Sequence, residues 1–209
     1  MYKVGFVDNS FDLFSDYQTR LRRHDIELLF PAAGNSKEEI VNWVLSNDIR
    51  CLLIDHKLSP DFDFAGTDLF AYINGALPDL PCMILTAYAP ESLQENLVIQ
   101  SMIENRDALD ASNLTSIVEK IKQAVEVFNK RLELREVEYQ VLLKAKQNDA
   151  IAAQQEERLD YLYQLLRSYG EVDELPTELL KPEMEQKIDL LIEKLNSVLG
   201  SVSSGRGDI

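Results

Sequence analysis

Short apolar runs that alternate with amphipathic stretches constrain the fold of this 209-residue chain more than any other feature. The apolar runs stand at 4–7, 26–30, 51–55, 81–86 and 99–103. Runs this short, with little polar alternation, are typical of strands buried on both faces of a parallel sheet. We therefore expect an α/β fold with five parallel strands in one doubly wound sheet, covered by helices on both faces.

Helix signals occupy the stretches between these runs. Residues 10–23 place apolar side chains at helical spacing behind Ser10, which is a preferred N-cap residue. Further along, Ser36-Lys-Glu-Glu39 has the S-x-x-E pattern of a capping box. We expect two more helices, at about 68–73 and 91–98.

The second half of the chain has a different character, because no glycine or proline occurs from Glu91 to Tyr169. Apolar residues recur there at three- to four-residue spacing on both sides of a more polar segment, 133–150. A helix over all of 112–168 would be a rod of roughly 85 Å. A rod with so narrow an apolar stripe needs a partner, either a second copy or a folded-back helix. The expected bend is at Gln147-Asn148-Asp149, since Asn and Asp favour caps.

These patterns divide the chain into four regions. A last amphipathic helix is expected at 176–199, after Gly170 has ended the preceding helix. The predicted regions are a sheet-containing domain at 1–112, a long helix, helical hairpin or coiled coil at 113–169, a C-terminal amphipathic helix region at 170–199 and a disordered tail at 200–209.

The charge of the chain argues against several classes of partner. The formal net charge is −15, so the basic footprint of a nucleic-acid-binding protein is missing, and an anionic membrane surface would repel the chain. No run approaches the ~20 apolar residues of a membrane span, and the first ten residues do not resemble a signal peptide. We expect a cytoplasmic protein. Cys51 and Cys82 lie in apolar runs, which indicates buried thiols.

Polar residues close three of the apolar runs. Asp8 follows the first run, Asp55 ends the third and Thr86 ends the fourth. The carboxyl ends of parallel strands meet at one edge of a sheet, so we expect these side chains to lie together. Carboxylates bind Mg²⁺ and can form an aspartyl phosphate, and a hydroxyl can bond phosphoryl oxygens. The alternative is that both aspartates only cap the turns that follow them.

In their order and spacing these pieces resemble the receiver domain of two-component response regulators. The matching residues are VDN at 7–9, LLIDHKLSP at 52–60, Gly66 and ILTAY at 84–88, and the resemblance covers about residues 1–125. It implies a flavodoxin-like sheet with strand order 2-1-3-4-5.

The resemblance also implies roles for individual residues. Asp55 would be the phosphoacceptor, and a histidine kinase or phosphotransfer protein would donate the phosphoryl group. Asp8 and Asn9, together with Asp55 and the backbone carbonyl of Lys57, would hold Mg²⁺. Thr86 would contact the phosphoryl group and change its position when Asp55 is phosphorylated.

Three positions depart from the family pattern, and one of them is the aromatic residue of the fifth strand, where Met102 and Ile103 stand instead. Asn9 stands where the family has a second acid, which weakens the expected Mg²⁺ site because hard cations prefer charged oxygen ligands. The family's lysine after the fifth strand has no clear counterpart, and Asn105 or Arg106 stands nearest to its place. We expect Arg106 to supply the missing positive charge.

Two functions remain open at this point. The leading one is a response-regulator-like signalling protein, not an enzyme, that is phosphorylated on Asp55 and acts on a protein partner through its C-terminal helices. The alternative is a phosphorylation-independent pseudo-receiver that serves as a dimeric scaffold. We expect a homodimer in either case. The second half has no histidine, which excludes a histidine phosphotransfer domain there.

Overall fold

The computed structural model describes residues 1–32, 36–87, 97–110, 113–148 and 150–172, together with Ile192 and Lys194. The helices and strands of these residues are, in chain order, β1 (Tyr2–Val7), α1 (Phe11–Arg22), β2 (Ile26–Leu29), α2 (Lys37–Ser46), β3 (Leu52–Asp55), α3 (Gly66–Ala76), β4 (Cys82–Thr86), η1 (Gln100–Met102), β5 (Ile103–Asn105), η2 (Arg106–Leu109), α5 (Leu114–Gln147) and α6 (Ala153–Ser168).

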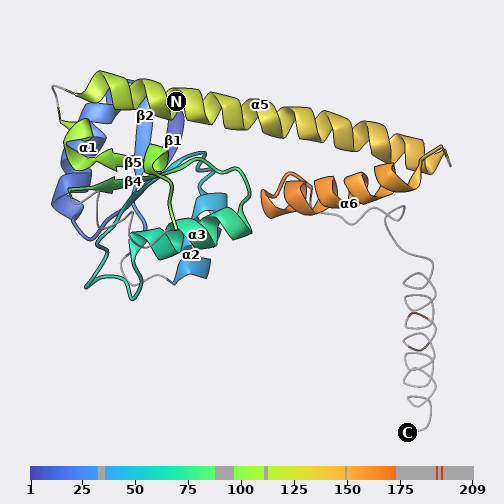
Figure 1. Ribbon diagram of the computed structural model, residues 1–209, viewed down its shortest axis with the longest axis horizontal. Helices are drawn as coiled ribbons and strands as arrows, with labels where there is room; N and C mark the ends of the chain where they lie inside the picture. Colours follow the sequence, from blue (N-terminus) through green and yellow to red (C-terminus); the bar gives the residue numbers. More distant parts are fainter. Residues whose placement is uncertain are drawn as a thin grey trace, which may run out of the picture.

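The five strands form one parallel sheet in the order β2-β1-β3-β4-β5, which confirms the expected fold class (Figure 1). Successive residues of a strand face opposite sides, so Leu53 packs with α1 and α5 while Leu52 and Ile54 pack with α2 and α3. Each face of the sheet is therefore covered by helices, and both clusters are apolar. This explains why the central strands show continuous apolar runs.

The helix starts follow the sequence signals. Ser10 caps α1, where its hydroxyl accepts a hydrogen bond of 3.4 Å from the backbone N–H of Leu13. Ser36 and Glu39 form the expected capping box at α2: each side chain accepts a hydrogen bond from the other residue's backbone N–H. These bonds satisfy donors that the first turn of a helix leaves unpaired.

The expected fifth strand is present, but its predicted bounds of 99–103 are wrong. Residues 100–102 form the 3-10 turn η1, in which the N–H of Met102 bonds the carbonyl of Ile99 at 2.9 Å. The strand begins at Ile103, which pairs with Ile84. A short apolar run can form either a strand or a turn, and the sequence alone does not show which of its residues pair with a neighbouring strand. A helix is also expected at 91–98, but residues 91–96 of that range lie outside the described residues.

The long helical region is a hairpin and not a straight rod (Figure 1). Helix α5 ends at Gln147, and α6 runs back along it with its apolar side chains buried between the two helices. Asn148 lies at the expected bend, and its side-chain amide donates to the carbonyl of Lys144 at 2.7 Å. Gly170, with φ +70°, follows α6 in the left-handed conformation that favours glycine at a helix end.

The hairpin is anchored to the sheet domain at the end of α6. The Tyr169 hydroxyl donates a hydrogen bond to the carbonyl of Pro78, and the Tyr169 ring lies 5.2 Å from that of Phe128. Two residues further along the chain, Glu171 pairs with Arg50 at 3.2 Å. The apolar residues of α6, of the distal part of α5 and of the α2–α3 face form one continuous cluster. The hairpin therefore packs as part of the domain.

None of the described helices combines the length and the apolar character needed to cross a membrane. The helix expected at 176–199 lies outside the described residues apart from Ile192 and Lys194, and the expected tail at 200–209 lies outside them entirely.

Candidate functional site

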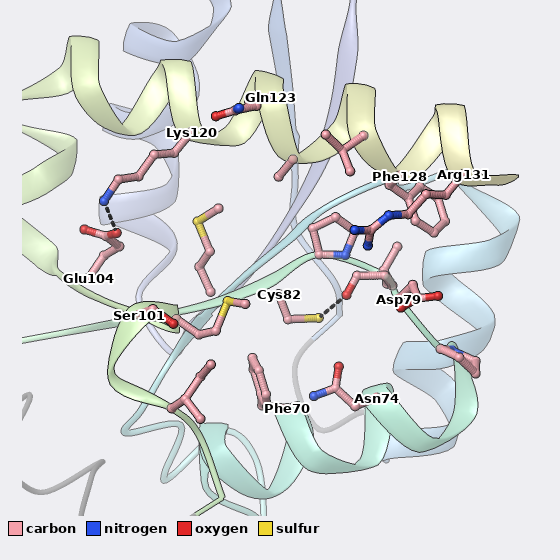
Figure 2. Close-up of a pocket in the computed structure, with 18 of the residues that line it drawn as sticks. Phe70, Asn74, Asp79, Cys82, Ser101, Glu104, Lys120, Gln123, Phe128 and Arg131 are labelled. Carbon is pink, nitrogen blue, oxygen red and sulfur yellow. Dashed lines mark hydrogen bonds and ion pairs between the residues drawn. The ribbon is translucent and has the colours of Figure 1, made fainter.

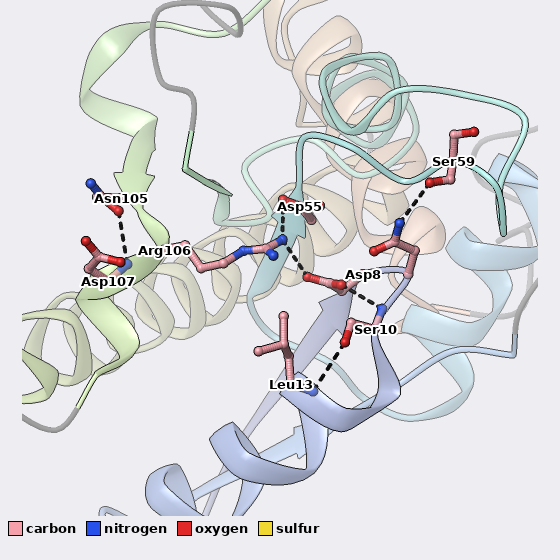
Figure 3. Close-up of polar contacts among 9 residues, drawn as sticks. Asp8, Ser10, Leu13, Asp55, Ser59, Asn105, Arg106 and Asp107 are labelled. Atoms are coloured by element: carbon pink, nitrogen blue, oxygen red, sulfur yellow. Dashed lines mark hydrogen bonds and ion pairs between the residues drawn. The ribbon is translucent and has the colours of Figure 1, made fainter.

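The carboxyl edge of the sheet brings together the residues that close its strands (Figure 3). Asp8 follows β1, Asp55 is the last residue of β3 and Thr86 is the last residue of β4. All three are buried, with exposed fractions of 1%, 5% and 2%. Arg106 reaches the same place because it follows β5 directly. The edge thus combines carboxylates, a hydroxyl and a guanidinium.

Arg106 bridges the two carboxylates. Its Nη2 atom lies 2.9 Å from Oδ2 of Asp8 and 2.5 Å from Oδ1 of Asp55 (Figure 3). The turn η2 begins at Arg106, and the Asn105 side chain caps it by accepting a hydrogen bond from the N–H of Asp107 at 3.0 Å. The end of β5 and this cap therefore position Arg106 beside the two carboxylates.

Burial and charge act in opposite directions on these groups. Burial raises the pKa of Asp8 and of Asp55 above the ordinary value, while the charge of Arg106 opposes the rise. Burial alone would lower the pKa of Arg106, but the charges of Asp55 and Asp8 leave that pKa raised. The backbone N–H groups of His56 and Lys57 also bond the Asp55 carboxylate and favour its charged form.

Asp8 and Asn9 are fixed by separate contacts at the end of β1. The Oδ1 atom of Asp8 accepts a hydrogen bond of 2.7 Å from the N–H of Ser10, which caps α1. The side-chain amide of Asn9 donates to the carbonyl of Ser59 at 2.8 Å. Asn9 therefore ties the end of β1 to the loop after β3, a role that its sequence position did not reveal.

Gly66 packs closely against the backbone of Asp55 and His56. Its N–H bonds the carbonyl of His56 at 2.9 Å. A Cβ atom at this position would lie 1.9 Å from the carbonyl oxygen of Asp55, closer than any real contact. Only glycine allows this approach. The sequence marks Gly66 as part of the resemblance, but the reason for the glycine emerges from the structure alone.

The oxygen atoms at this edge fit a Mg²⁺ ion in part. Asp8 and Asp55 offer carboxylate oxygens, the ligands that this ion prefers, and the carbonyl of Lys57 follows Asp55 by two residues. Asn9 contributes at most a neutral amide oxygen. No group of three or more His, Cys, Asp or Glu side chains gathers anywhere in the described residues. A Mg²⁺ ion here would share the two carboxylates with Arg106.

Comparisons with known proteins return similar structures and nothing else. No family model and no curated protein matches the chain. A response regulator receiver domain protein from Clostridium thermocellum is 19% identical, covers 63% of this chain and 98% of its own, and has a TM-score of 0.47. The signal receiver domain of an HD domain-containing protein from Pseudomonas fluorescens is 16% identical, with coverages of 63% and 92% and a TM-score of 0.49. A response regulator from Thermotoga maritima is 19% identical, with coverages of 60% and 98% and a TM-score of 0.45.

The strand order of the sheet decides the fold. Five parallel strands in the order 2-1-3-4-5, with helices on both faces, make the flavodoxin-like receiver fold. In folds of this type, ligands bind at the carboxyl ends of the strands. That is the edge at which Asp8, Asp55, Thr86 and Arg106 meet.

Proposed function

We propose that this chain is a response-regulator-like signalling protein in which Asp55 accepts a phosphoryl group. The observation that carries the proposal is the bridge of Arg106 between Asp8 and Asp55 at the carboxyl edge of the sheet. A buried acid held in its charged form by one cation is suited to nucleophilic attack. The module is a signalling element, not an enzyme.

In the proposed transfer, an Oδ atom of Asp55 attacks the phosphorus of a phosphohistidine or of a small acyl phosphate. The new O–P bond forms as the bond to the donor breaks, and the donor leaves with the electron pair. Arg106 lies within 2.5 Å of Asp55 and stabilises negative charge on the transferring group. Thr86, at the end of the neighbouring strand, offers its hydroxyl to the phosphoryl oxygens.

Mg²⁺ would be held by Asp8, Asp55 and the Lys57 carbonyl, and when bound it neutralises charge on the phosphoryl oxygens. Asn9 gives this chain one carboxylate fewer than the family pattern, so Arg106 carries a larger share of that neutralisation.

The proposed output is a change in the C-terminal helices. Arg106 is the first residue of η2, and the N-terminal turn of α5 packs against η2. A phosphoryl group on Asp55 competes with the carboxylates for Arg106 and so alters the contacts of η2. The state of Asp55 would thereby shift the population between two packings of α5 and α6, which a protein partner reads.

A second function, a phosphorylation-independent scaffold, is favoured by two contacts. Arg106 already pairs with both carboxylates, and the Asn9 amide is bound to the carbonyl of Ser59. In this alternative the bridge is a permanent structural element, and the chain presents its helices to a partner constitutively.

Intact mass after incubation with Mg²⁺ and acetyl phosphate separates the two functions. We expect wild-type protein to gain one phosphoryl group and Asp55→Asn to gain none. Asn9→Asp restores a second acid and should raise the yield and lower the Mg²⁺ concentration that is needed. If neither wild type nor Asn9→Asp is labelled under conditions that label a control receiver, the phosphoacceptor role is overturned and the scaffold remains.

A further inference from the structure

A groove of about 860 Å³ runs along the outer edge of the sheet, between α3 and α5 (Figure 2). It exists because β5 is short: it pairs with β4 only from Ile84 to Thr86, and no other described strand lies beside Cys82 and Met83 on that side. In Figure 2, Phe70 on α3 and Gln123 on α5 lie on opposite sides of the opening. The groove is therefore an uncovered part of the edge of the fold.

The groove is lined by large apolar side chains that face solvent. Ile99 is 65% exposed, and Leu97, Val127 and Met102 are exposed by 43%, 43% and 39%. Contiguous exposed apolar side chains of this size mark an interaction surface. The surface is separate from the carboxyl edge, where Arg106 and the two aspartates lie.

Charged residues border the groove. Lys120 pairs with Glu104 at 2.5 Å on one side, and Asp79 is bound to Arg135 near the other end. Arg131 also lines the groove and is exposed, and it makes no ion pair within the part of the chain that the structure describes. An occupant with an apolar face and acidic neighbours would satisfy both features.

The continuously described chain ends beside this groove. Tyr169 binds the carbonyl of Pro78, which lines the groove, and its ring contacts Phe128, which lines it as well. Val172 packs against the same apolar cluster. The 11 residues of 173–183 could span up to roughly 36 Å when extended. The segment that follows them can therefore reach any part of the groove.

That segment has the matching pattern. Its apolar residues recur at three- to four-residue spacing and would share one face of a helix at 100° per residue. They are Met184, Ile188, Leu191, Ile192, Leu195 and Leu199. Ile192 lies on this face and its side chain is 51% exposed, so it is accessible for an apolar contact. Glu185 and Asp189 border the face and provide negative charge for Arg131.

We propose that residues 184–199 bind in the groove between α3 and α5 of the same chain. Two apolar surfaces joined by a short tether meet at a millimolar effective concentration, which favours the intramolecular contact over a free partner. Residues 88–96, which precede Leu97 in the chain, have Leu93 as their only large aliphatic side chain and match the groove poorly. The proposal is independent of phosphorylation, because the groove does not include Asp55.

Disulfide trapping in the full-length chain tests this contact. The test variant carries Ile99→Cys in the groove and Ile192→Cys in the segment. The control variant carries Ile192→Cys with Phe11→Cys, which is equally exposed at 64% but lies on α1. Cys51 is buried, and burial raises the pKa of its thiol, so it stays unreactive; Cys82 lines the groove and is replaced by serine in both variants. We expect the test pair to form an internal disulfide at least about tenfold faster than the control pair.

Leu191→Glu in the test variant should abolish that difference, because it places a charge on the apolar face of the segment and leaves the residues of the groove unchanged. Equal rates for the test and control pairs would overturn the proposal. So would an unchanged rate in the Leu191→Glu variant, since the disulfide would then report random encounters. Exclusive formation of disulfide-linked dimers would assign the groove to the segment of a second copy and overturn the intramolecular contact.

Discussion

Arg106 determines the electrostatics of the carboxyl edge at the scale of single residues. Its one guanidinium pairs with two buried carboxylates, and its own side chain is 26% exposed. Burial raises the pKa values of Asp8 and Asp55, and Arg106 limits that rise. An acid with a raised pKa in the folded state adds stability below its unfolded pKa. That contribution is lost as the pH rises through the folded pKa.

Replacing Arg106 with Gln should therefore destabilise the protein in a pH-dependent way. The pKa values of Asp8 and Asp55 rise further without the guanidinium, so the loss is small in acid and large at neutral pH. We expect about 3 kcal/mol at pH 7, the lower end of the range for breaking a buried pair. Urea unfolding at pH 7 and at about pH 4.5 measures the difference. Arg106→Lys keeps the charge and serves as the control; an equal deficit at both pH values would contradict this account.

A methyl group at Gly66 should cost stability, because its Cβ atom would lie 1.9 Å from the Asp55 carbonyl oxygen. We expect Gly66→Ala to lower the free energy of unfolding by at least about 2 kcal/mol and to displace Asp55. Gly75→Ala is the matched control in the same helix, since nothing lies within 4 Å of its Cβ position. That change should be neutral or stabilise by up to about 1 kcal/mol. Chemical denaturation of both variants gives the comparison, and similar losses would refute the steric argument.

The α5–α6 hairpin is the element that distinguishes this chain from a bare receiver fold. The buried residues of α6 and of the distal part of α5 belong to the same apolar cluster as the α2–α3 face of the sheet, and Arg50 lies over the Phe128 ring at 5.9 Å. A cluster that is continuous in this way predicts that the hairpin and the sheet unfold together. The end of α6 is held by both the Tyr169 hydrogen bond and the Glu171 ion pair.

Replacing Leu159, a fully buried residue of α6, with alanine tests whether the hairpin and the sheet unfold together. We expect Leu159→Ala to lower the free energy of unfolding by about 2–5 kcal/mol, through lost burial and the cavity left behind. The transition should remain single when followed by Trp43 fluorescence and by circular dichroism. Glu136→Ala, at an exposed position of α5, should cost less than about 0.5 kcal/mol. Two separate transitions would show that the hairpin folds as an independent unit.

At the scale of the whole molecule, α5 leaves a second apolar surface open. Leu134, Val137 and Val141 are exposed by 57%, 58% and 61%, at the spacing of a coiled-coil seam. This stripe lies beyond the groove along α5. A homodimer, expected from the sequence, would use it.

We expect sedimentation to show wild-type dimers that dissociate in the Val137→Glu variant, because a charge in the centre of a helical seam is desolvated at high cost. Asp16→Lys, on the exposed side of α1, is a control that changes the net charge without touching the stripe. A monomeric wild type at high micromolar concentration would remove the stripe from consideration as a dimer interface.

The sequence by itself determined the order of strands and helices, the helix starts at Ser10 and Ser36, and the polar residues at the strand ends. These features depend on periodicity and on hydrogen bonds between residues three or four apart, so they can be read locally. The bend is predicted at Gln147-Asn148-Asp149 for the same reason, and Asn148 lies at it. The parallel sheet followed because buried strands that alternate with helices allow few arrangements.

The tertiary structure alone decided how distant groups meet. The bridge of Arg106 to Asp8 joins residues 98 positions apart, and the contact of Tyr169 with Pro78 joins residues 91 apart. The start of β5 at Ile103 depends on its pairing with β4, and no local pattern encodes that register. Contacts of this kind arise from packing, in which the position of each side chain depends on the whole core. For that reason the sequence predicted that Arg106 supplies positive charge at this edge, while the structure decided that its one guanidinium bridges both aspartates.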